Sequence, residues 1–421
     1  MSKYSRRSFV GLLATSTAAL SMPSIALGAI PRVVVIGGGA GGATAARYIA
    51  KDSKGAVHVT LVEASKRYYT CFFSNLYLGG FRNYGSIGHN YYGLAVNHGV
   101  NLVHEWAVSV DGTAKKVNLG SGASISYDKL IISPGIDLKY DSINGYSAEA
   151  QSRMPHAWKS GTQVQLLKSQ VRNMKQGGTF VMVPPPNPYR CPPGPYERVS
   201  MIAHQFKKTN PTAKIVILDP KKKFSKQGLF MEGWQKHYPG MIEWINSETH
   251  GGIKNINAAK MEFETDLDTF KADAACVVPA QRAGGIAMAA GVNKGDWCPI
   301  VPGTMQSQAD ENIYVLGDAS VAKSMPKSGF SANSQAKVAA NHVRGNLTGS
   351  KVFPARYSNT CWSLVATNDG IKVGASYKAG AEKIDKTSGF ISKTGEDSNL
   401  RKATYEESLG WYSGITTDMF S

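Results

Sequence analysis

Short runs of consecutive apolar and β-branched residues recur along the chain. Runs of about four to eight such residues are typical of strands in a parallel sheet whose two faces are both covered. Helical stretches, Ala43–Ala50 and Tyr196–Phe206, follow two of the runs. The pattern therefore predicts an α/β protein built from strand–turn–helix units. The predicted strand segments are Arg32–Ile36, Val57–Val62, Tyr127–Gly135, Thr179–Val183, Lys214–Asp219 and Asn312–Ala319.

The loop after the first strand, Arg32–Ile36, is rich in glycine. Gly37, Gly39 and Gly42 fit the spacing G-x-G-x-x-G between a strand and a helix. Glycines there allow a tight turn, close approach to a pyrophosphate and close helix packing, with the helix N-terminus facing the phosphates. The next strand ends in Glu63, which is placed to accept a hydrogen bond from a ribose hydroxyl. Strand, glycines, helix, strand and acid in this order predict a dinucleotide site.

The second strand–turn–helix unit lacks this glycine loop. Between Thr179–Val183 and Tyr196–Phe206 the chain carries seven prolines and a single cysteine, Cys191. Proline has no N–H to direct at a phosphate, and it fixes φ. The unit is therefore predicted to hold a stiff loop in place of a phosphate cradle, which disfavours an NADH-dependent reductase. The acid that ends its second strand, Asp219, is expected to cap the strand rather than to bind a ribose.

Two later segments favour FAD over NAD as the dinucleotide. Tyr127–Gly135 is a strand entering a Pro-Gly turn, and Asn312–Ala319 is a strand ending in Gly-Asp. Together they resemble the paired segments of flavoproteins with two dinucleotide-binding domains, the glutathione reductase-like group. By that resemblance Asp318 binds the ribityl or phosphate region of FAD, and the helix from about Ser331 directs its positive end at the flavin pyrimidine. The cofactor-binding residues predicted so far are Gly37, Gly39, Gly42, Glu63, Gly135, Gly317 and Asp318.

The N-terminus resembles an export signal. Arg6 and Arg7 precede a short, weakly apolar stretch and the small residues Ala26–Ala29. This arrangement is typical of twin-arginine signals, and that route exports folded proteins, which suits an enzyme whose cofactor is inserted first. Pro23 interrupts the apolar stretch, so a stable membrane span is not expected there. We therefore predict a periplasmic protein with residues 1–29 as its signal peptide and no membrane span elsewhere.

The 421 residues carry a formal net charge of +17. Lys3, Arg6 and Arg7 would leave with the signal, and the remaining positive charges are scattered. The clusters Lys207–Lys208 and Lys221–Lys223 are expected to be solvated loops, and no nucleic-acid motif accompanies them. A basic surface can steer an acidic protein partner or an anionic substrate, and the charge supports no more than that.

The spacing of the five cysteines excludes several kinds of site. No pair forms C-x-x-C, which argues against zinc, iron–sulfur and thioredoxin-type sites, and no C-x-x-C-H exists for covalent c-type haem. In an oxidising periplasm free exposed thiols are a liability, whereas disulfides persist. An odd number leaves at least one cysteine with another role. The cysteines are Cys71, Cys191, Cys276, Cys298 and Cys361.

Over essentially its whole length the chain resembles the flavoprotein subunit of flavocytochrome c sulfide dehydrogenase. The segments that carry the resemblance are the export signal, VVVIGGGAGGATAARYIA, RYYTCFFSNLYLGG, PPNPYRCPPGPYERVSMIAH, IYVLGDA and NTCWSLVATNDG. In that family a cysteine matching Cys71 holds the flavin through its 8α-methyl group. Cys191 and Cys361 match the two cysteines of a redox-active disulfide, although a purely structural disulfide stays open. The resemblance thus implies FAD attached covalently to Cys71 and catalytic residues Cys191 and Cys361.

The function implied by the resemblance is periplasmic oxidation of hydrosulfide. Hydrosulfide attacks the disulfide to give a persulfide and a thiolate, and the thiolate passes electrons to the flavin. The electrons then leave singly to a c-type cytochrome, which must be a separate subunit because this chain has no haem motif. Two alternatives stay open. One is a sulfide:quinone reductase, for which a basic amphipathic C-terminal anchor would be expected, and this tail is neither basic nor clearly amphipathic. The other is a secreted flavin-binding protein without activity.

The predicted fold class is α/β, with two Rossmann-like, glutathione reductase-like domains and a C-terminal α+β interface domain. Residues 30–147 and 279–349 are expected to form the FAD-binding domain. Residues 148–278 are expected to form the second Rossmann-like domain, without a functional NAD site, and residues 350–421 the interface domain. Cys276 and Cys298 would be either a structural bridge or two buried thiols. Three aromatic residues of the last domain are as compatible with a core as with a partner surface: Trp362, Trp411 and Tyr412.

Overall fold

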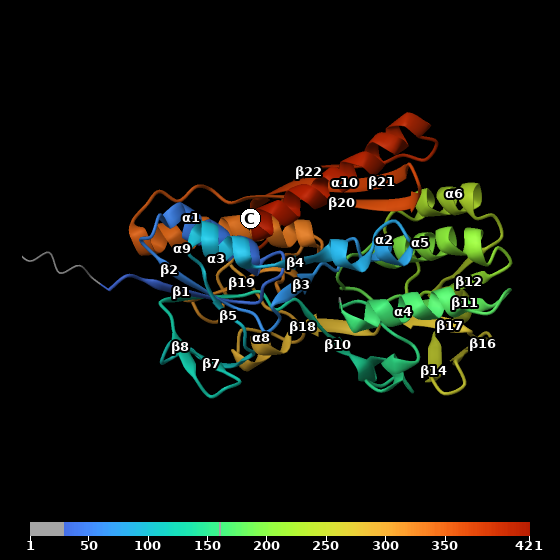
Figure 1. Ribbon diagram of the computed structural model, residues 1–421, viewed down its shortest axis with the longest axis horizontal. Helices are drawn as coiled ribbons and strands as arrows, with labels where there is room; N and C mark the ends of the chain where they lie inside the picture. The colour runs from blue at the N-terminus through green and yellow to red at the C-terminus, as the bar shows by residue number, and fades with distance from the viewer. Residues whose placement is uncertain (1–28, 160) are drawn as a thin grey trace, which may run out of the picture. The chain divides into compact units, whose positions relative to one another are not determined.

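Five parallel strands form the first sheet, in the order β19-β9-β1-β2-β5 (Figure 1). The computed structural model describes residues 29–159 and 161–421, and Pro31–Ser421 forms one compact unit. Four of the five residues of the central strand β1 are buried, as expected for a β-branched run covered on both faces. Helix α1 packs against α9 beside this sheet. The elements are β1 (Arg32–Ile36), β2 (His58–Val62), β5 (Asn101–Val103), β9 (Lys129–Ile132), β19 (Ile313–Val315), α1 (Gly42–Ser53), α3 (Tyr92–His98) and α9 (Gly329–Thr348).

A second parallel sheet has the order β13-β12-β11-β17. Side chains of its strand β11 alternate between two hydrophobic cores: Phe180 and Met182 pack into one, and Val181 and Val183 into the other. Both faces of the sheet are therefore covered, which is why the sequence shows an apolar run without alternation. The elements are β11 (Thr179–Val183), β12 (Lys214–Leu218), β13 (Ile242–Ile245), β17 (Ala274–Val277), α4 (Thr162–Asn173), α5 (Gly194–Thr209) and α6 (Gln227–His237).

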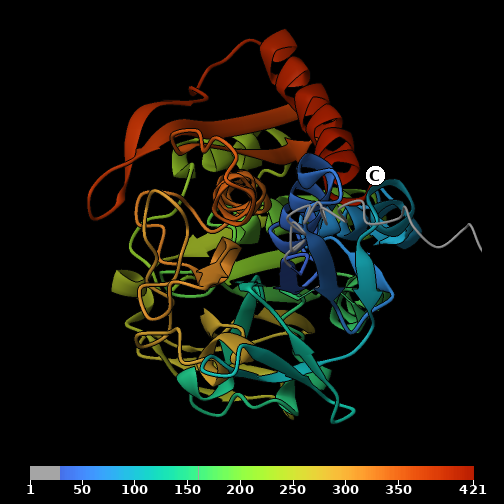
Figure 2. The ribbon, with the colours of Figure 1, turned by 90° about the vertical axis from the view of Figure 1, so that its left-hand side faces the viewer.

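The C-terminal part is a three-stranded antiparallel sheet, β20-β21-β22, with the long helix α10 packed on β21 (Figure 2). Strand β20 contacts α9 of the first half and α5 and α6 of the second, so it brings C-terminal residues to the junction of the two. The end of α10 is fixed by Asp418, which accepts hydrogen bonds from Tyr48 Oη and Asn333 Nδ2, both at 2.8 Å. These elements are β20 (Arg356–Ala366), β21 (Asp369–Ala379), β22 (Ile384–Ile391) and α10 (Ser398–Phe420).

Short elements complete the chain. Among them is an antiparallel pair of strands: β10 precedes the strands of the second sheet in the sequence, and β18 follows them. The predicted α/β class with two Rossmann-like sheets is confirmed, whereas the domain boundaries stay a prediction. The predicted export signal lies outside the described residues, apart from Ala29. The short elements are β3 (Arg67–Tyr69), β4 (Gly88–Asn90), β6 (Ala107–Asp111), β7 (Lys116–Leu119), β8 (Ser124–Ser126), β10 (Ile136–Lys139), β14 (Ile253–Asn257), β15 (Glu262–Thr265), β16 (Thr269–Lys271), β18 (Ala280–Ala283), α2 (Ser74–Leu78), α7 (Ser247–His250), α8 (Gly285–Ala289) and the 3-10 turns Tyr84–Ile87, Tyr140–Ser142, Ala150–Ser152 and Gly317–Ala319.

Candidate functional site

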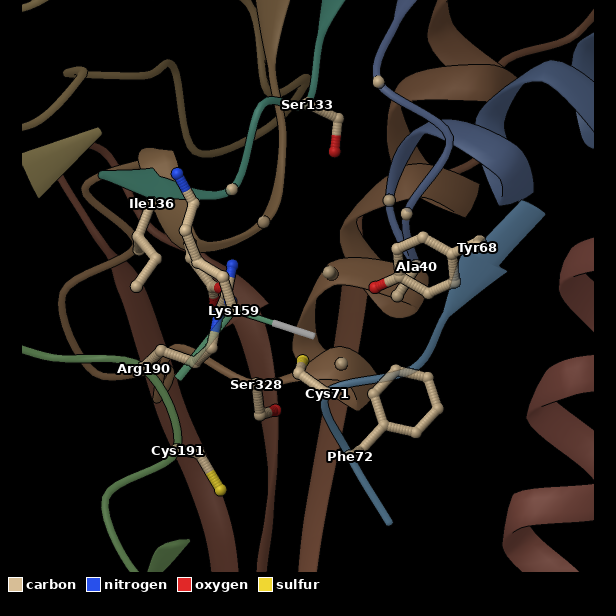
Figure 3. Close-up of a pocket in the computed structure, with 18 of the residues that line it drawn as sticks. Ala40, Tyr68, Cys71, Phe72, Ser133, Ile136, Lys159, Arg190, Cys191 and Ser328 are labelled. Carbon is tan, nitrogen blue, oxygen red and sulfur yellow. The ribbon is translucent and has the colours of Figure 1, made fainter. Parts of the chain in front are cut away.

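A cavity of about 590 Å³ lies where the carboxyl ends of the first sheet meet the proline loop and the C-terminal sheet (Figure 3). Ligands of open α/β sheets bind at this edge. Nine of the ten predicted site residues line the cavity, although they come from segments far apart in the sequence. Gly42 is the exception, although its neighbour Gly41 lines the cavity. The nine are Gly37, Gly39, Glu63, Cys71, Gly135, Cys191, Gly317, Asp318 and Cys361.

The glycine loop after β1 has the shape of a dinucleotide cradle. Gly37 has a φ of 95°, and a Cβ there would collide with the carbonyl oxygen of Ser133. A Cβ on Gly42 would collide with the carbonyl oxygen of Gly37, so this glycine serves close helix packing. The Gly38 N–H donates a hydrogen bond of 2.8 Å to Glu63 Oε2, which holds the carboxylate at the loop. The ribose-binding role of Glu63 stays a prediction.

Asp318 takes part in a partly buried ion pair that the sequence did not predict. Arg190 Nε donates to Asp318 Oδ2 at 2.6 Å. Burial by itself would lower the pKa of Arg190, but the Asp318 carboxylate together with Cys71 and Tyr68 outweighs it, and the pKa is raised. The only sequence signal of Arg190 was its place directly before Cys191 in the proline loop.

The second carboxylate oxygen of Asp318, Oδ1, is buried and has no hydrogen-bond partner among the described residues. Buried polar atoms are almost always paired, so an orphaned acceptor beside a cavity fits a hydroxyl group of a bound ligand. The ribityl chain of a flavin presents such hydroxyls. The glycine cradle and this orphaned oxygen therefore both fit a flavin dinucleotide.

The N-terminus of α9 makes one end of the cavity positive. Ser328, Gly329 and Phe330 line the cavity, and Ser328 Oγ caps the helix by accepting from the Ser331 N–H at 3.1 Å. The unpaired N–H groups of a helix N-terminus carry a partial positive charge. The helix begins at Gly329, two residues before its predicted start. This end of the cavity therefore favours negative charge, as was predicted for the flavin pyrimidine.

Cys71 lies between β3 and α2 and is half-buried. Its carbonyl oxygen accepts from Ser74 Oγ at 2.6 Å, so the first residue of α2 holds the backbone of Cys71 in place. Figure 3 shows Cys71 in the cavity, on a different segment from Cys191. This placement is what attachment to a ring in the cavity requires, and the covalent link stays a prediction.

Cys191 and Cys361 reach the same cavity from the proline loop and from β20. Cys191 has a φ of 58°, and its N–H donates to the Lys327 carbonyl at 2.7 Å, which fixes the loop against the segment leading into α9. Burial raises the pKa of both thiols, and Cys361 raises that of Cys191 further, so the two lie within electrostatic range. Each is a free thiol in the structure. Their pairing stays a prediction.

Sequence reasoning missed two charged groups beside the cysteines, the half-buried Glu197 and the buried Lys226. Glu197 on α5 accepts from Asn75 Nδ2 at 2.8 Å and from the Leu364 N–H at 2.9 Å, and burial raises its pKa. Lys226, directly before α6, donates from Nζ to the carbonyl oxygen of Cys361 at 3.1 Å. Neither has a distinctive sequence signal, because an acid in a first helical turn and a lysine in a lysine-rich loop are both common.

The place of a second dinucleotide site is filled by protein groups. Lys221 was expected in a solvated loop, which is wrong: the residue is 8% exposed. Its Nζ donates to the Pro185 carbonyl and pairs with Asp219 Oδ1, both at 2.8 Å. Asp219 also accepts from Tyr196 Oη at 2.6 Å and is fully buried. The lysine is buried because a buried carboxylate and a proline-loop carbonyl satisfy its charge, and Asp219 has the structural role that was predicted.

We expect neither NADH nor NADPH to bleach the flavin at millimolar concentration. The loop Pro184–Pro195 offers few N–H groups to a pyrophosphate, and the Lys221–Asp219 pair occupies the strand end where a ribose would bind. The measurement is flavin absorbance under anaerobic conditions after each nucleotide is added, with dithionite as the positive control. Rapid stoichiometric bleaching by either nucleotide would contradict this description of the second sheet.

Cys276 and Cys298 belong to different hydrophobic cores. Cys276 Sγ accepts from Arg198 Nη1 at 3.2 Å, and the Cys298 N–H donates to the Ala319 carbonyl at 2.9 Å. Both are buried free thiols. Of the two alternatives left open by the sequence, the structure has two buried thiols.

The aromatic residues of the C-terminal part divide between core and cavity wall. Tyr412 is 3% exposed, and its hydroxyl is 3.0 Å from Thr70 Oγ1. Trp362 and Trp411 line the cavity and stack on each other with 5.3 Å between ring centroids. The two tryptophans thus form a wall of the site, whereas Tyr412 belongs to the core.

Residues 29–159 and 161–421 contain neither a candidate membrane span nor a candidate metal site. No helix there is long and apolar enough to cross a membrane. No group of three or more histidine, cysteine, aspartate or glutamate side chains is arranged to hold a metal ion.

Three family models match the chain. The first, pyridine nucleotide-disulphide oxidoreductase, matches residues 31–177. Residues 164–279 match the central part of the sulfide dehydrogenase [flavocytochrome c] flavoprotein chain, and residues 354–420 match the flavin-binding part of flavocytochrome c sulphide dehydrogenase. The chain belongs to the flavocytochrome c sulfide dehydrogenase flavoprotein family. The predicted flavin binding and the predicted class of oxidoreductase are thereby confirmed.

Solved structures with this fold include several oxidoreductases. A sulfide:quinone oxidoreductase from Aquifex aeolicus has a TM-score of 0.68 at 17% identity, with 92% of each chain covered. A ferredoxin reductase from Rhodopseudomonas palustris has a TM-score of 0.65 at 17% identity, covering 87% of this chain and 89% of that one. An NAD-dependent persulfide reductase from A. fulgidus has a TM-score of 0.63 at 16% identity, covering 90% of this chain and 77% of that one. At these identities the likeness shows a shared fold.

Proposed function

We propose that this flavoprotein oxidises hydrosulfide at a Cys191–Cys361 disulfide and passes the electrons through FAD to a c-type cytochrome subunit. The observation that carries the proposal is that Cys71, Cys191 and Cys361, from three separate segments, line one cavity that also contains the glycine cradle. In a family of sulfide dehydrogenase flavoproteins, one of these cysteines is available to hold the flavin and two remain to react with sulfide.

The residues that would hold FAD are distributed along the cavity. The N–H groups of the glycine loop and of α1 would receive the pyrophosphate, Glu63 a ribose hydroxyl and Asp318 Oδ1 a ribityl hydroxyl. The Cys71 sulfur would form a thioether with the 8α-methyl group. When bound, the flavin supplies two-electron acceptance and one-electron release, which joins sulfide oxidation to a haem carrier.

The chain's own groups would carry out the sulfur chemistry. A hydrosulfide sulfur attacks one sulfur of the disulfide, and the other leaves as a thiolate. The Glu197 carboxyl, with its raised pKa, is suited to hold the proton that hydrosulfide gives up when its sulfur is released in oxidised form. The stacked Trp362 and Trp411 form an apolar wall that limits the access of water.

The sequence supports the proposed partner and compartment. The family's name implies a cytochrome, and this chain has no C-x-x-C-H, so the haem must be carried by another polypeptide. The twin-arginine pattern supports export to the periplasm in the folded state. A sulfide:quinone reductase is the second candidate, because a protein of that activity shares the fold.

The experiment is to purify the exported protein with its copurifying chains and record its absorbance before and after sulfide is added without oxygen. We expect flavin bleaching together with reduction of a c-type haem, either copurified or added as a soluble cytochrome c. If sulfide reduced a water-soluble ubiquinone analogue but no cytochrome, the quinone reductase would be favoured. Failure to bleach the flavin at all would leave the non-catalytic alternative.

A further inference from the structure

Lys226 is a buried ammonium group that forms no ion pair with a carboxylate of the described residues. The residue is 5% exposed and has a left-handed φ of 61° just before α6. Its Nζ donates to the carbonyl oxygen of Cys361 at 3.1 Å and to Ser363 Oγ at 2.8 Å, with the Ile371 carbonyl at 3.5 Å. No ion pair within the described part of the chain includes it. Burying an unpaired charge is costly, so an anion that forms beside Lys226 is stabilised.

The groups that face Lys226 come from four parts of the fold. They are Cys361 on β20, Glu197 on α5, Cys191 in the proline loop and Arg401 on α10. Burial lowers the pKa of Lys226 to about 8, and the nearby Arg401 contributes to the decrease. The two cysteines and Glu197 oppose it, because negative charge on them favours the ammonium form. At neutral pH the ammonium is therefore mostly protonated, and a thiolate next to it would strengthen that state.

The two thiols differ in the groups that can stabilise a negative charge on them. Burial and Glu197 raise the pKa of both thiols, and Lys226 opposes this at both. Cys361 Sγ also accepts a hydrogen bond from Asn359 Nδ2 at 3.4 Å, and Lys226 Nζ donates to the Cys361 carbonyl oxygen at 3.1 Å. The Cys191 sulfur has no such hydrogen bond among the described residues, and Cys361 raises the pKa of Cys191 further. The cavity is thus arranged to accept a negative charge on Cys361 before Cys191.

We propose that Lys226 is a positioning residue that stabilises Cys361 as the leaving thiolate, so that hydrosulfide attacks Cys191 and the transferred sulfur stays there. This rests on the proposed function. In the step, the sulfur of HS⁻ bonds to Cys191 Sγ, the Cys191–Cys361 bond breaks, and Cys361 keeps the electron pair of that bond. The persulfide on Cys191 keeps the proton of hydrosulfide, so atoms and charge balance. A more stable leaving thiolate departs faster, which gives the direction of attack.

The first test measures the two thiols separately in the reduced holoprotein. Iodoacetamide labelling is followed over a pH series, and mass spectrometry of the peptides gives the rate for each cysteine. In the unmodified protein Cys361 should react at lower pH than Cys191. In Lys226→Met the Cys361 profile should move up by about one pH unit, which is a ~10-fold slower labelling at neutral pH. Lys236→Met, an exposed lysine of α6, should leave both profiles unchanged.

The second test locates the transferred sulfur. The oxidised protein is mixed with less than one equivalent of sulfide, quenched with iodoacetamide and digested, and the alkylated persulfide should be found on the Cys191 peptide. A persulfide on Cys361, or a Cys361 profile that Lys226→Met does not move, would overturn the proposal. If Lys226→Met does not fold, the order of reactivity and the persulfide position in the unmodified protein still decide. Failure of sulfide to bleach the flavin would contradict the proposed function instead, since the labelling test needs no sulfide.

Discussion

Replacing either Cys191 or Cys361 with serine should slow bleaching of the flavin by sulfide at least ~1000-fold, while dithionite still bleaches it fully. Removal of one sulfur removes the electrophile that hydrosulfide attacks, but it leaves the cradle and the Arg190–Asp318 pair intact. Anaerobic stopped-flow absorbance of the flavin measures both reactions in the same preparation. The size of the effect is expected because the disulfide is the only route from sulfide to flavin in the proposed mechanism.

Cys276→Ser is the matched control for this prediction. Cys276 is a buried cysteine that is hydrogen-bonded to Arg198 and to the His156 carbonyl, and a hydroxyl can replace both contacts. Its sulfide bleaching should remain nearly normal. A purely structural Cys191–Cys361 disulfide would behave differently, because its loss costs ~2–5 kcal/mol of stability and spares the chemistry of whatever stays folded. Near-normal sulfide bleaching in a folded Cys191→Ser or Cys361→Ser protein would rule out the mechanism.

Cys71→Ser should release the flavin completely when the protein is precipitated with acid. In the unmodified protein a thioether would survive denaturation, so the yellow colour should stay in the pellet, whereas non-covalent FAD would go to the supernatant. Flavin absorbance of the two fractions is the measurement. The native Cys71→Ser protein should still bind FAD, since the cradle, Glu63 and Asp318 are unchanged.

The control for the attachment is Cys191→Ser, which changes another cysteine of the same cavity. Its pellet should remain yellow after acid precipitation. Colour lost from the pellet of the unmodified protein would exclude a covalent flavin. Colour retained by Cys71→Ser would mean that a different residue holds the flavin.

Contiguous patterns in the sequence predicted the local parts of this protein well. The strands Arg32–Ile36 and Thr179–Val183 have their predicted bounds, because runs of apolar residues report directly on strands that are covered on both faces. The glycine spacing predicted the turn around Gly37, since only glycine tolerates its positive φ and the nearby Ser133 carbonyl. The proline loop likewise predicts that no second phosphate cradle forms, and the nucleotide experiment above tests that prediction. The resemblance to a family predicted that three cysteines belong to one site, which their spacing alone would not have indicated.

Only the tertiary structure decided which partners the charged side chains of the site have. Arg190 bonds to Asp318 across 128 positions of the chain, and Lys226 bonds to the Cys361 carbonyl across 135. In the sequence Arg190 and Lys226 look like ordinary surface charges, and Lys221 was wrongly expected in solvent. Charged side chains are buried only where packing supplies partners for them, and strand β20, which contacts both halves of the molecule, supplies those partners here. The sequence by itself therefore determined the strands, the cradle and the kind of chemistry, while the electrostatic environment of the cysteines followed from long-range packing.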